Sequence, residues 1–388
     1  MRFTKPKKVI GLDIGTHAVK AVQMSRSGDR LIIEDMGYAL VDRTRVTSDP
    51  VSAQAEALRE ALEGMPVQQC HVVGALPGQT VVIRYPRLKR LAPAEMDAAI
   101  EAEARHNIPY DLAEVFLDWS LLDEETEGDE TNLKVLLVAA KHEVIETRLR
   151  IAQAVDVQFG VLSVDSLALA DAAEGAHLLS NEGTTALLNI GASSVSIHFT
   201  KNGTSNFIRD INWGAKELIQ AIAKARRCDF EHAEAMLADY DSEAERGRHS
   251  TPPPLEKPKS NNAGLLDPLD EETEPVSRED LSAPTPLTDV LAIPIGRLVS
   301  EIRRSFDYYE HQLYEHPVDR IVLSGGIAHL TPIREALKND LDIEHVVLAN
   351  PVDGSISLGR KAAIPQFEEH PAQFMVAVGL AARGAADL

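Results

Sequence analysis

Two short segments, Gly11-Leu-Asp-Ile-Gly-Thr-His-Ala-Val-Lys20 and Leu187-Leu-Asn-Ile-Gly-Ala-Ser-Ser-Val-Ser196, share one design and decide the fold. Each runs from an apolar strand through an acidic or amide residue to Ile-Gly, then through small polar residues into another strand. Glycine lets backbone N–H groups approach phosphate oxygens because no Cβ intervenes. One such turn is a weak signal, since hairpins use glycine widely, but two copies in two halves of a chain indicate paired phosphate-binding loops.

Asp13 and the small polar residues of these turns supply the remaining chemistry. An aspartate just before such a turn can hold Mg²⁺, usually through water, against the β- and γ-phosphates of a nucleotide. Hydroxyl side chains add donors without crowding, whereas we expect Lys20, on the returning strand, at the surface. We therefore expect ATP and Mg²⁺, with the metal on Asp13 and a nucleotide-binding site made of Asp13, Gly15, Thr16, Gly191, Ala192, Ser193 and Ser194.

A third element is Ile321-Val-Leu-Ser-Gly-Gly-Ile-Ala328, a buried strand that runs into a double glycine ahead of a helix. Bare backbone at such a turn lets a planar base and its ribose lie against it. By itself the element is equally well explained as an ordinary strand-to-helix turn. Combined with the two loops, it predicts an adenosine site at Gly325, Gly326 and Ile327.

The composition restricts the class of protein. A net charge of −21 argues against nonspecific binding to nucleic acid or bare anionic lipid, which needs clustered Lys and Arg. No run of 18 apolar residues occurs that could span a bilayer. Cys70 and Cys228 are the only cysteines, so neither a disulfide framework nor a zinc site is supported. We expect a cytoplasmic protein.

The spacing of apolar residues divides the chain into predicted strands, predicted helices and one polar segment. From 241 to 287 the chain is rich in Pro, Ser, Asp and Glu, and such a composition predicts disorder. No Ser/His/Asp triad and no carboxylate pair sharing one site can be assembled, so no catalytic residue is assigned. The pattern predicts strands at 9–14, 18–24, 31–39, 71–76, 81–85, 115–122, 134–140 and 321–323, a strand pair over 186–200, and helices at 52–62, 93–107, 142–155, 215–225, 230–240, 291–314, 331–341 and 371–383.

The order of these elements resembles the actin/Hsp70/FtsA superfamily, and within it the PilM family of type IV pilus assembly proteins. The segments that carry the likeness are a helix followed by Ile-Pro, Glu-Val and Asp, a Ser-Val-Asp-Ser strand end, an aromatic cluster and the closing segment. They are Glu95-Met-Asp-Ala-Ala-Ile-Glu-Ala-Glu-Ala104, Asn107-Ile-Pro-Tyr110, Glu114-Val115, Asp118, Ser163-Val-Asp-Ser-Leu-Ala-Leu-Ala170, Phe306-Asp-Tyr-Tyr309 and 371–384.

The resemblance implies an α/β, actin-like (ribonuclease H-like) two-lobed ATPase fold with an inserted α+β subdomain of the SHS2 type. It also implies nucleotide contacts from Gly214 and Glu217, at the start of the helix that passes the ribose in relatives. The expected parts are a first lobe in pieces 1–78 and 161–185, an inserted subdomain 79–160, a second lobe 186–370 that contains the disordered 241–287, and a closing helix 371–388 on the first lobe.

Asn189 stands where the superfamily usually has aspartate, which predicts ATP binding with slow or absent hydrolysis. By the resemblance we expect a cytoplasmic scaffold for a type IV pilus or related secretion machine. It would hold the N-terminal cytoplasmic peptide of a PilN-like inner-membrane protein in a groove beside the inserted subdomain, so that membrane contact is indirect. The alternative is an FtsA-like filament former of cell division.

Overall fold

The computed structural model describes residues 8–28, 30–127, 130–249, 285–360 and 362–386. These form two compact units, the larger made of residues 1–217 and 295–388 and the smaller of residues 218–294. Both phosphate loops and the predicted adenosine turn lie in the larger unit.

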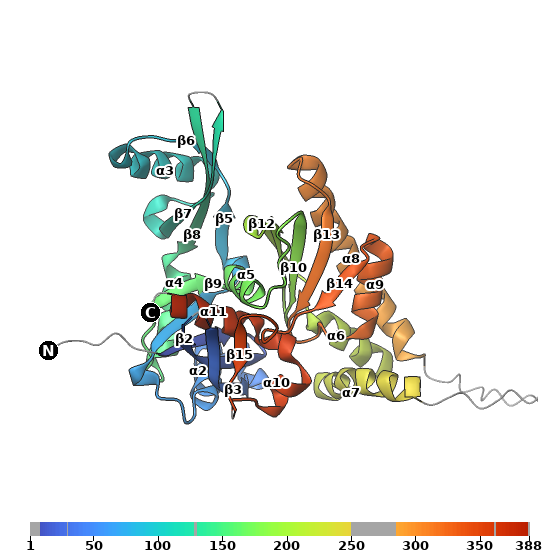
Figure 1. Ribbon diagram of the computed structural model, residues 1–388. Helices are drawn as coiled ribbons and strands as arrows, with labels where there is room; N and C mark the ends of the chain where they lie inside the picture. Colours follow the sequence, from blue (N-terminus) through green and yellow to red (C-terminus); the bar gives the residue numbers. More distant parts are fainter. Residues whose placement is uncertain (1–7, 29, 128–129, 250–284, 361, 387–388) are drawn as a thin grey trace, which may run out of the picture. The chain divides into compact units, whose positions relative to one another are not determined.

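The first sheet of the larger unit has six strands in the order β15-β3-β2-β1-β4-β9 (Figure 1). The central strand β1 is antiparallel to β2 and parallel to β4, so the predicted meander of the first three strands is extended by crossover strands. The bounds are β1 Lys8–Ile14, β2 Ala18–Ser27, β3 Arg30–Leu40, β4 His71–Leu76, β9 Val161–Val164 and β15 Ile356–Leu358.

Both faces of this sheet are covered, which is why β1 reads as a nearly continuous apolar run. On one face, α11 (Met375–Ala386) approaches β1 so closely that a Cβ added at Gly11 would lie 2.2 Å from the carbonyl oxygen of Ala377. On the other face, Ile10 and Leu12 pack in a core with α2 (Pro50–Ala61). The sheet is therefore the middle layer of three.

The second sheet has the order β12-β11-β10-β13-β14 and places the second phosphate loop at the end of β10 (Figure 1). Phe199 of β11 stacks on Tyr309, with ring centroids 4.3 Å apart, and so joins the sheet to the chain that follows α8. The strands are β10 Thr184–Ile190, β11 Val195–Lys201, β12 Thr204–Ile211, β13 Val318–Ser324 and β14 His345–Leu348.

The inserted block forms a third sheet in which β8 pairs with β5 and β6 on one side and with β7 on the other. The hydrophobic core of this block does not include α4, the last helix that we predicted for it. Ile151 and Ala152 of α4 are buried in the first-lobe core instead. The separately packed block is thus smaller than 79–160. Its elements are β5 Val81–Arg84, β6 Arg87–Lys89, α3 Pro93–Asn107, β7 Val115–Glu127 and β8 Glu130–Lys141, followed by α4 His142–Gln153.

The remaining helices largely follow the sequence pattern. The helix α7 (Phe230–His249) continues nine residues into the stretch 241–287 for which we expected disorder, and residues 250–284 of that stretch lie outside the described part. The others are α1 Arg43–Val46, α5 Asp165–Gly175, α6 Ala215–Arg226, α8 Leu287–Asp307 with a π-helical turn Tyr308–Gln312, α9 Thr331–Leu341 and α10 Pro365–Glu369, with 3₁₀ turns at Val67–Gln69, Gly78–Thr80, Leu112–Glu114 and Pro371–Phe374.

Candidate functional site

The first loop is a tight turn between β1 and β2. The amide of Gly15 donates to the carbonyl of Ala18 at 3.1 Å, and the Gln54 side chain donates to the Gly15 carbonyl at 2.9 Å. Asp13 lies opposite Lys20 in the strand register, and its Oδ2 is 3.2 Å from the Lys20 Nζ. Lys20 is therefore not the surface residue that we expected, since its side chain is only 14% exposed and is paired with the predicted metal ligand.

The second loop is held from behind by the residues that follow β12. The amides of Ala215 and Lys216 donate to the carbonyls of Gly191 and Ala192 at 3.0 and 3.1 Å. A Cβ added at Gly214 would lie 2.5 Å from the Ser193 nitrogen. Gly214 is thus required by loop packing, independently of any nucleotide contact. Glu217 lies in the first turn of α6, where its amide donates to the Gly214 carbonyl at 3.0 Å.

The two loops meet although they belong to different sheets. The Thr16 Oγ1 and the Ser193 Oγ are 3.4 Å apart, across a separation of 177 residues in the chain. The hydroxyls of the two turns therefore face one another, while the amides of Gly15 and Gly191 donate to carbonyls within their own turns.

The Gly325-Gly326 turn packs on the end of β10, just before the second loop. Gly325 has φ +100°, and an added Cβ would lie 2.2 Å from the Ile190 carbonyl oxygen, so glycine is required there. The position of Gly326 is open, with no atom within 4 Å of an added Cβ. Ile327 is nearly buried. The third predicted element is thus joined to the second loop and leaves bare backbone at Gly326.

Two carboxylates that sequence reasoning missed lie near one another behind these loops. Asp165, at the first position of α5, accepts hydrogen bonds from the amides of Gly78 and Ser166 at 3.0 and 2.6 Å. A Cβ added at Gly78 would lie 2.8 Å from an oxygen of Asp210 and 3.0 Å from one of Asp165. The statement that no carboxylate pair can be assembled is therefore wrong. The pair joins residues far apart in the chain, and only the Ser-Val-Asp-Ser motif around Asp165 hinted at it.

The environment of this pair shifts its ionisation. Burial, and then the neighbouring Asp210, raise the pKa of Asp165 to about 7. Burial raises the pKa of Asp210 to about 6. Arg148 is also buried and donates to the Ile14 carbonyl at 3.0 Å. Burial lowers the pKa of Arg148, while Asp13 and Asp165 favour its charge. Because Lys20 is paired with Asp13, two cations and three carboxylates lie together between the first loop and β12.

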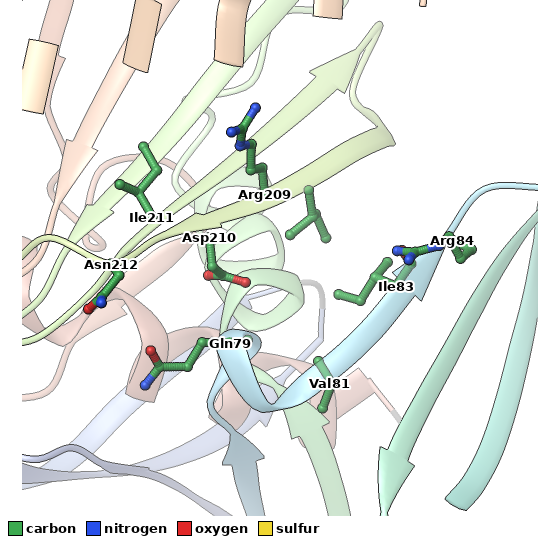
Figure 2. A pocket seen from close by; sticks show the side chains of 10 residues that line it. Gln79, Val81, Ile83, Arg84, Arg209, Asp210, Ile211 and Asn212 are labelled. Carbon is green, nitrogen blue, oxygen red and sulfur yellow. The ribbon is translucent and has the colours of Figure 1, made fainter. Parts of the chain in front are cut away.

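A cavity of about 320 Å³ opens between β5 and β12, beside the inserted block. Figure 2 shows Asp210 pointing into it from β12, across from Val81 and Ile83 of β5, while Arg209 points away from Asp210. Gly78 and Gln79, from the 3₁₀ turn that leads into the inserted block, complete its floor. This is the groove between the inserted block and the body of the larger unit.

Polar contacts fix the position of the inserted block beside this groove. The Tyr85 hydroxyl lies 2.8 Å from the Ser205 Oγ, which is 2.8 Å from the Nε2 of the buried His198. Lys134 donates to the Asn206 side chain. Burial raises the pKa of Tyr85, and burial lowers the pKa of His198 to about 4, so both groups are neutral near pH 7. The block is therefore tied to the first residues of β12.

Known proteins with the same architecture place this site in context. The family described as "Type IV pilus assembly protein PilM" matches residues 11–243 and 271–385. A solved PilM–PilN type IV pilus biogenesis complex contains a chain with TM-score 0.75 and 22% identity, covering 97% of this chain and 98% of that one. The ethanolamine utilization protein EutJ from Carboxydothermus hydrogenoformans matches with TM-score 0.52 and 14% identity, over 98% of this chain and 90% of its own.

A more distant likeness is to MreB5 of Spiroplasma citri bound to ADP, with TM-score 0.48 and 12% identity over 97% and 95% of the two chains. Within the described residues, every helix is too short or too polar to cross a bilayer. The predicted actin-like fold is confirmed. With the family match spanning nearly all of its length, this chain belongs to the PilM family of type IV pilus assembly proteins.

Proposed function

We propose that this protein is an ATP-binding scaffold of type IV pilus assembly that works at the cytoplasmic face of the inner membrane. It binds Mg²⁺-ATP between its two phosphate loops and holds the N-terminal cytoplasmic peptide of a PilN-like membrane protein beside the inserted block. The observation that carries the nucleotide part is the contact between Thr16 and Ser193, because it brings two glycine turns from separate sheets to one point.

Asp13, Thr16, Ser193 and the amides around Gly191 would hold the phosphates and Mg²⁺, with Gly326 beside the adenosine. Mg²⁺ would neutralise phosphate charge, and its oxygen-ligand preference suits the carboxylate of Asp13. Lys20 contacts the Asp13 Oδ2, which the metal would also use. On metal binding, Lys20 would therefore move toward the phosphates or share Asp13 with the metal. These residues bind and orient a nucleotide by charge and by backbone donors.

Hydrolysis is expected to be slow or absent. Asn189 lies at the strand end, where its Oδ1 is 3.5 Å from the Ser324 Oγ, and a neutral amide cannot take a proton from water. Nucleotide then serves as an occupant that favours one arrangement of the loops over another. Phosphate-release measurements over hours with saturating ATP test this expectation, and turnover at about 1 s⁻¹, a typical enzymatic rate, would contradict it.

The partner part rests on the groove between β5 and β12. The structure of the PilM–PilN complex shows that a relative of similar fold assembles with PilN. In this chain the groove is lined by aliphatic and polar side chains and has open backbone edges at β5 and β12, which suits an extended peptide. In this proposal, membrane contact is made through the partner.

A matched pair of variants tests the peptide site. Val81→Arg fills the groove, whereas Leu121→Arg places the same charge on an exposed leucine of β7 that lies outside it. In a calorimetric titration with the N-terminal peptide of the PilN-like partner, we expect Val81→Arg to lose at least about tenfold in affinity, which corresponds to about 1.4 kcal/mol of binding free energy. Leu121→Arg should bind like the wild type. The reverse result would place the peptide on the β7 side of the block.

A further inference from the structure

The groove beside the inserted block is lined by aliphatic and polar side chains, among which are one carboxylate, Asp210, and two arginines, Arg84 and Arg209. Val81 and Ile83 lie on one side, and Ile208 lies two residues before Asp210 on the other, so that both project from the same face of β12. Figure 2 shows Asp210 on β12, across from Val81 and Ile83 of β5. A long apolar stem with a positively charged end matches this arrangement better than a purely apolar side chain would.

Asp210 has a second carboxylate, Asp165, beside it and makes no ion pair within the described residues. The oxygens of Asp165 and Asp210 both face Gly78, and the arginine next in sequence, Arg209, points away. Two carboxylates this close cannot both be charged at low cost unless a positive group joins them. The other arginines nearby are engaged by carbonyl groups, since Arg84 donates to the Ile83 carbonyl at 2.8 Å and Arg148 donates to the Ile14 carbonyl at 3.0 Å. Among the described residues, Asp210 therefore has no positive partner of its own.

We infer that Asp210 receives a lysine or arginine side chain of the bound partner peptide, whose aliphatic stem lies between Val81, Ile83 and Ile208. This inference rests on the proposed peptide groove and adds the chemistry that selects the peptide. The raised pKa values of Asp165 and Asp210 are consistent with it, because a bound cation would favour the ionised forms that burial disfavours. A buried, charge-assisted hydrogen bond of this kind is also stronger than a neutral one.

The test is a double-mutant cycle measured by calorimetry on the full-length protein. The probes are the N-terminal peptide of the PilN-like partner and copies in which each Lys or Arg in turn is replaced by norleucine. Asp210→Asn keeps the shape of the side chain and removes its charge. The control is Glu143→Gln, which removes one charge from a side chain that is 77% exposed on α4. Melting curves verify that each variant is folded.

We expect Asp210→Asn and one norleucine peptide each to weaken binding at least about tenfold, as a lost charge-assisted hydrogen bond does. Combined, they should weaken it no more than either change alone. Glu143→Gln should bind like the wild type. Wild-type affinity in Asp210→Asn, or losses that multiply, would overturn the inference and leave the peptide groove standing.

A second probe separates the two proposals if the wild-type protein does not bind the peptide. N-acetyl-lysine methylamide, compared with its norleucine analogue, is titrated while amide NMR shifts are followed at residues 79–83 and 208–212. Shifts specific to lysine that disappear in Asp210→Asn would support the cation site while the peptide proposal fails. Equal shifts with both compounds, or none, would overturn the cation site as well.

Discussion

Asp13 has one interaction that the structure shows, with Lys20, and one that we propose, with Mg²⁺. Its Oδ2 lies 3.2 Å from the Lys20 Nζ, and the two side chains are 20% and 14% exposed. Asp13→Ala removes both interactions. The loss of the charge-assisted contact to Mg²⁺ should weaken Mg²⁺-ATP binding by about 1 to 3 kcal/mol, or roughly 5- to 150-fold. Lys20 would then be largely buried without its partner, and this should lower the free energy of unfolding, also by about 1 to 3 kcal/mol.

Calorimetric titrations with ATP in Mg²⁺ and in EDTA separate these two effects. Lys20→Met breaks the same ion pair but keeps the carboxylate, so it should lose stability while its binding still depends on Mg²⁺. Asp13→Ala should bind ATP equally well with and without the metal. If Asp13→Ala retained the wild-type gain from Mg²⁺, or if Lys20→Met lost that gain to the same extent, Asp13 would not be the metal ligand.

Further substitutions test other parts of the site. Gly326→Ala meets no atom within 4 Å, so stability should change by less than about 0.5 kcal/mol while calorimetry shows weaker ATP binding; unchanged affinity would remove the adenosine from this turn. Gly214→Ala would place its Cβ 2.5 Å from backbone atoms of the second loop, and urea unfolding should show a loss of about 1 to 3 kcal/mol, with weaker ATP binding; wild-type values for both would contradict the packing argument. The pKa of Asp165 is about 7 in the fold against an ordinary 3.8, so the folded state binds more protons between these values and wild-type stability falls as pH rises through them. The side chain of Asp165→Asn cannot ionise, so the free energy of unfolding of this variant, measured by urea titration, should rise by up to about 4 kcal/mol relative to wild type between pH 4 and pH 8. Parallel pH profiles of the two proteins would refute the raised pKa of Asp165. Tyr85→Phe loses the hydrogen bond to Ser205 and should cost about 1 kcal/mol, with faster amide exchange in β5 as the measurement; unaltered exchange would mean that the bond does not hold the block.

Local patterns were sufficient for the parts of the fold whose residues are neighbours in sequence. The glycine turns at Gly15 and Gly191 were predicted because the residues that form each turn are consecutive in the sequence. The helix 93–107 was predicted to the residue, since Pro93 begins it and Ile-Pro follows it. The strands β14 and β15 were not predicted, because each has four residues or fewer and forms only by pairing with a distant strand.

The candidate site was predictable only at its glycine turns, whose residues are neighbours in sequence. Asp165 and Asp210 come together because β12 runs past the turn at Gly78, and no spacing in the sequence encodes that approach. Lys20 alternates with apolar neighbours as a surface residue would, and only the register of β1 against β2 shows that it pairs with Asp13. The helix α4 looked like part of the inserted block because it follows its last strand directly, yet its apolar face fits the first-lobe core.

The close approach of α11 to β1 also connects the first loop to a segment that is distant in sequence. The strand that carries this loop has one face covered by residues 375–386. A change that displaced this helix would expose the apolar face of the sheet to water. Such a change would therefore alter the proposed ATP site through the strand, without touching any residue of the loop itself.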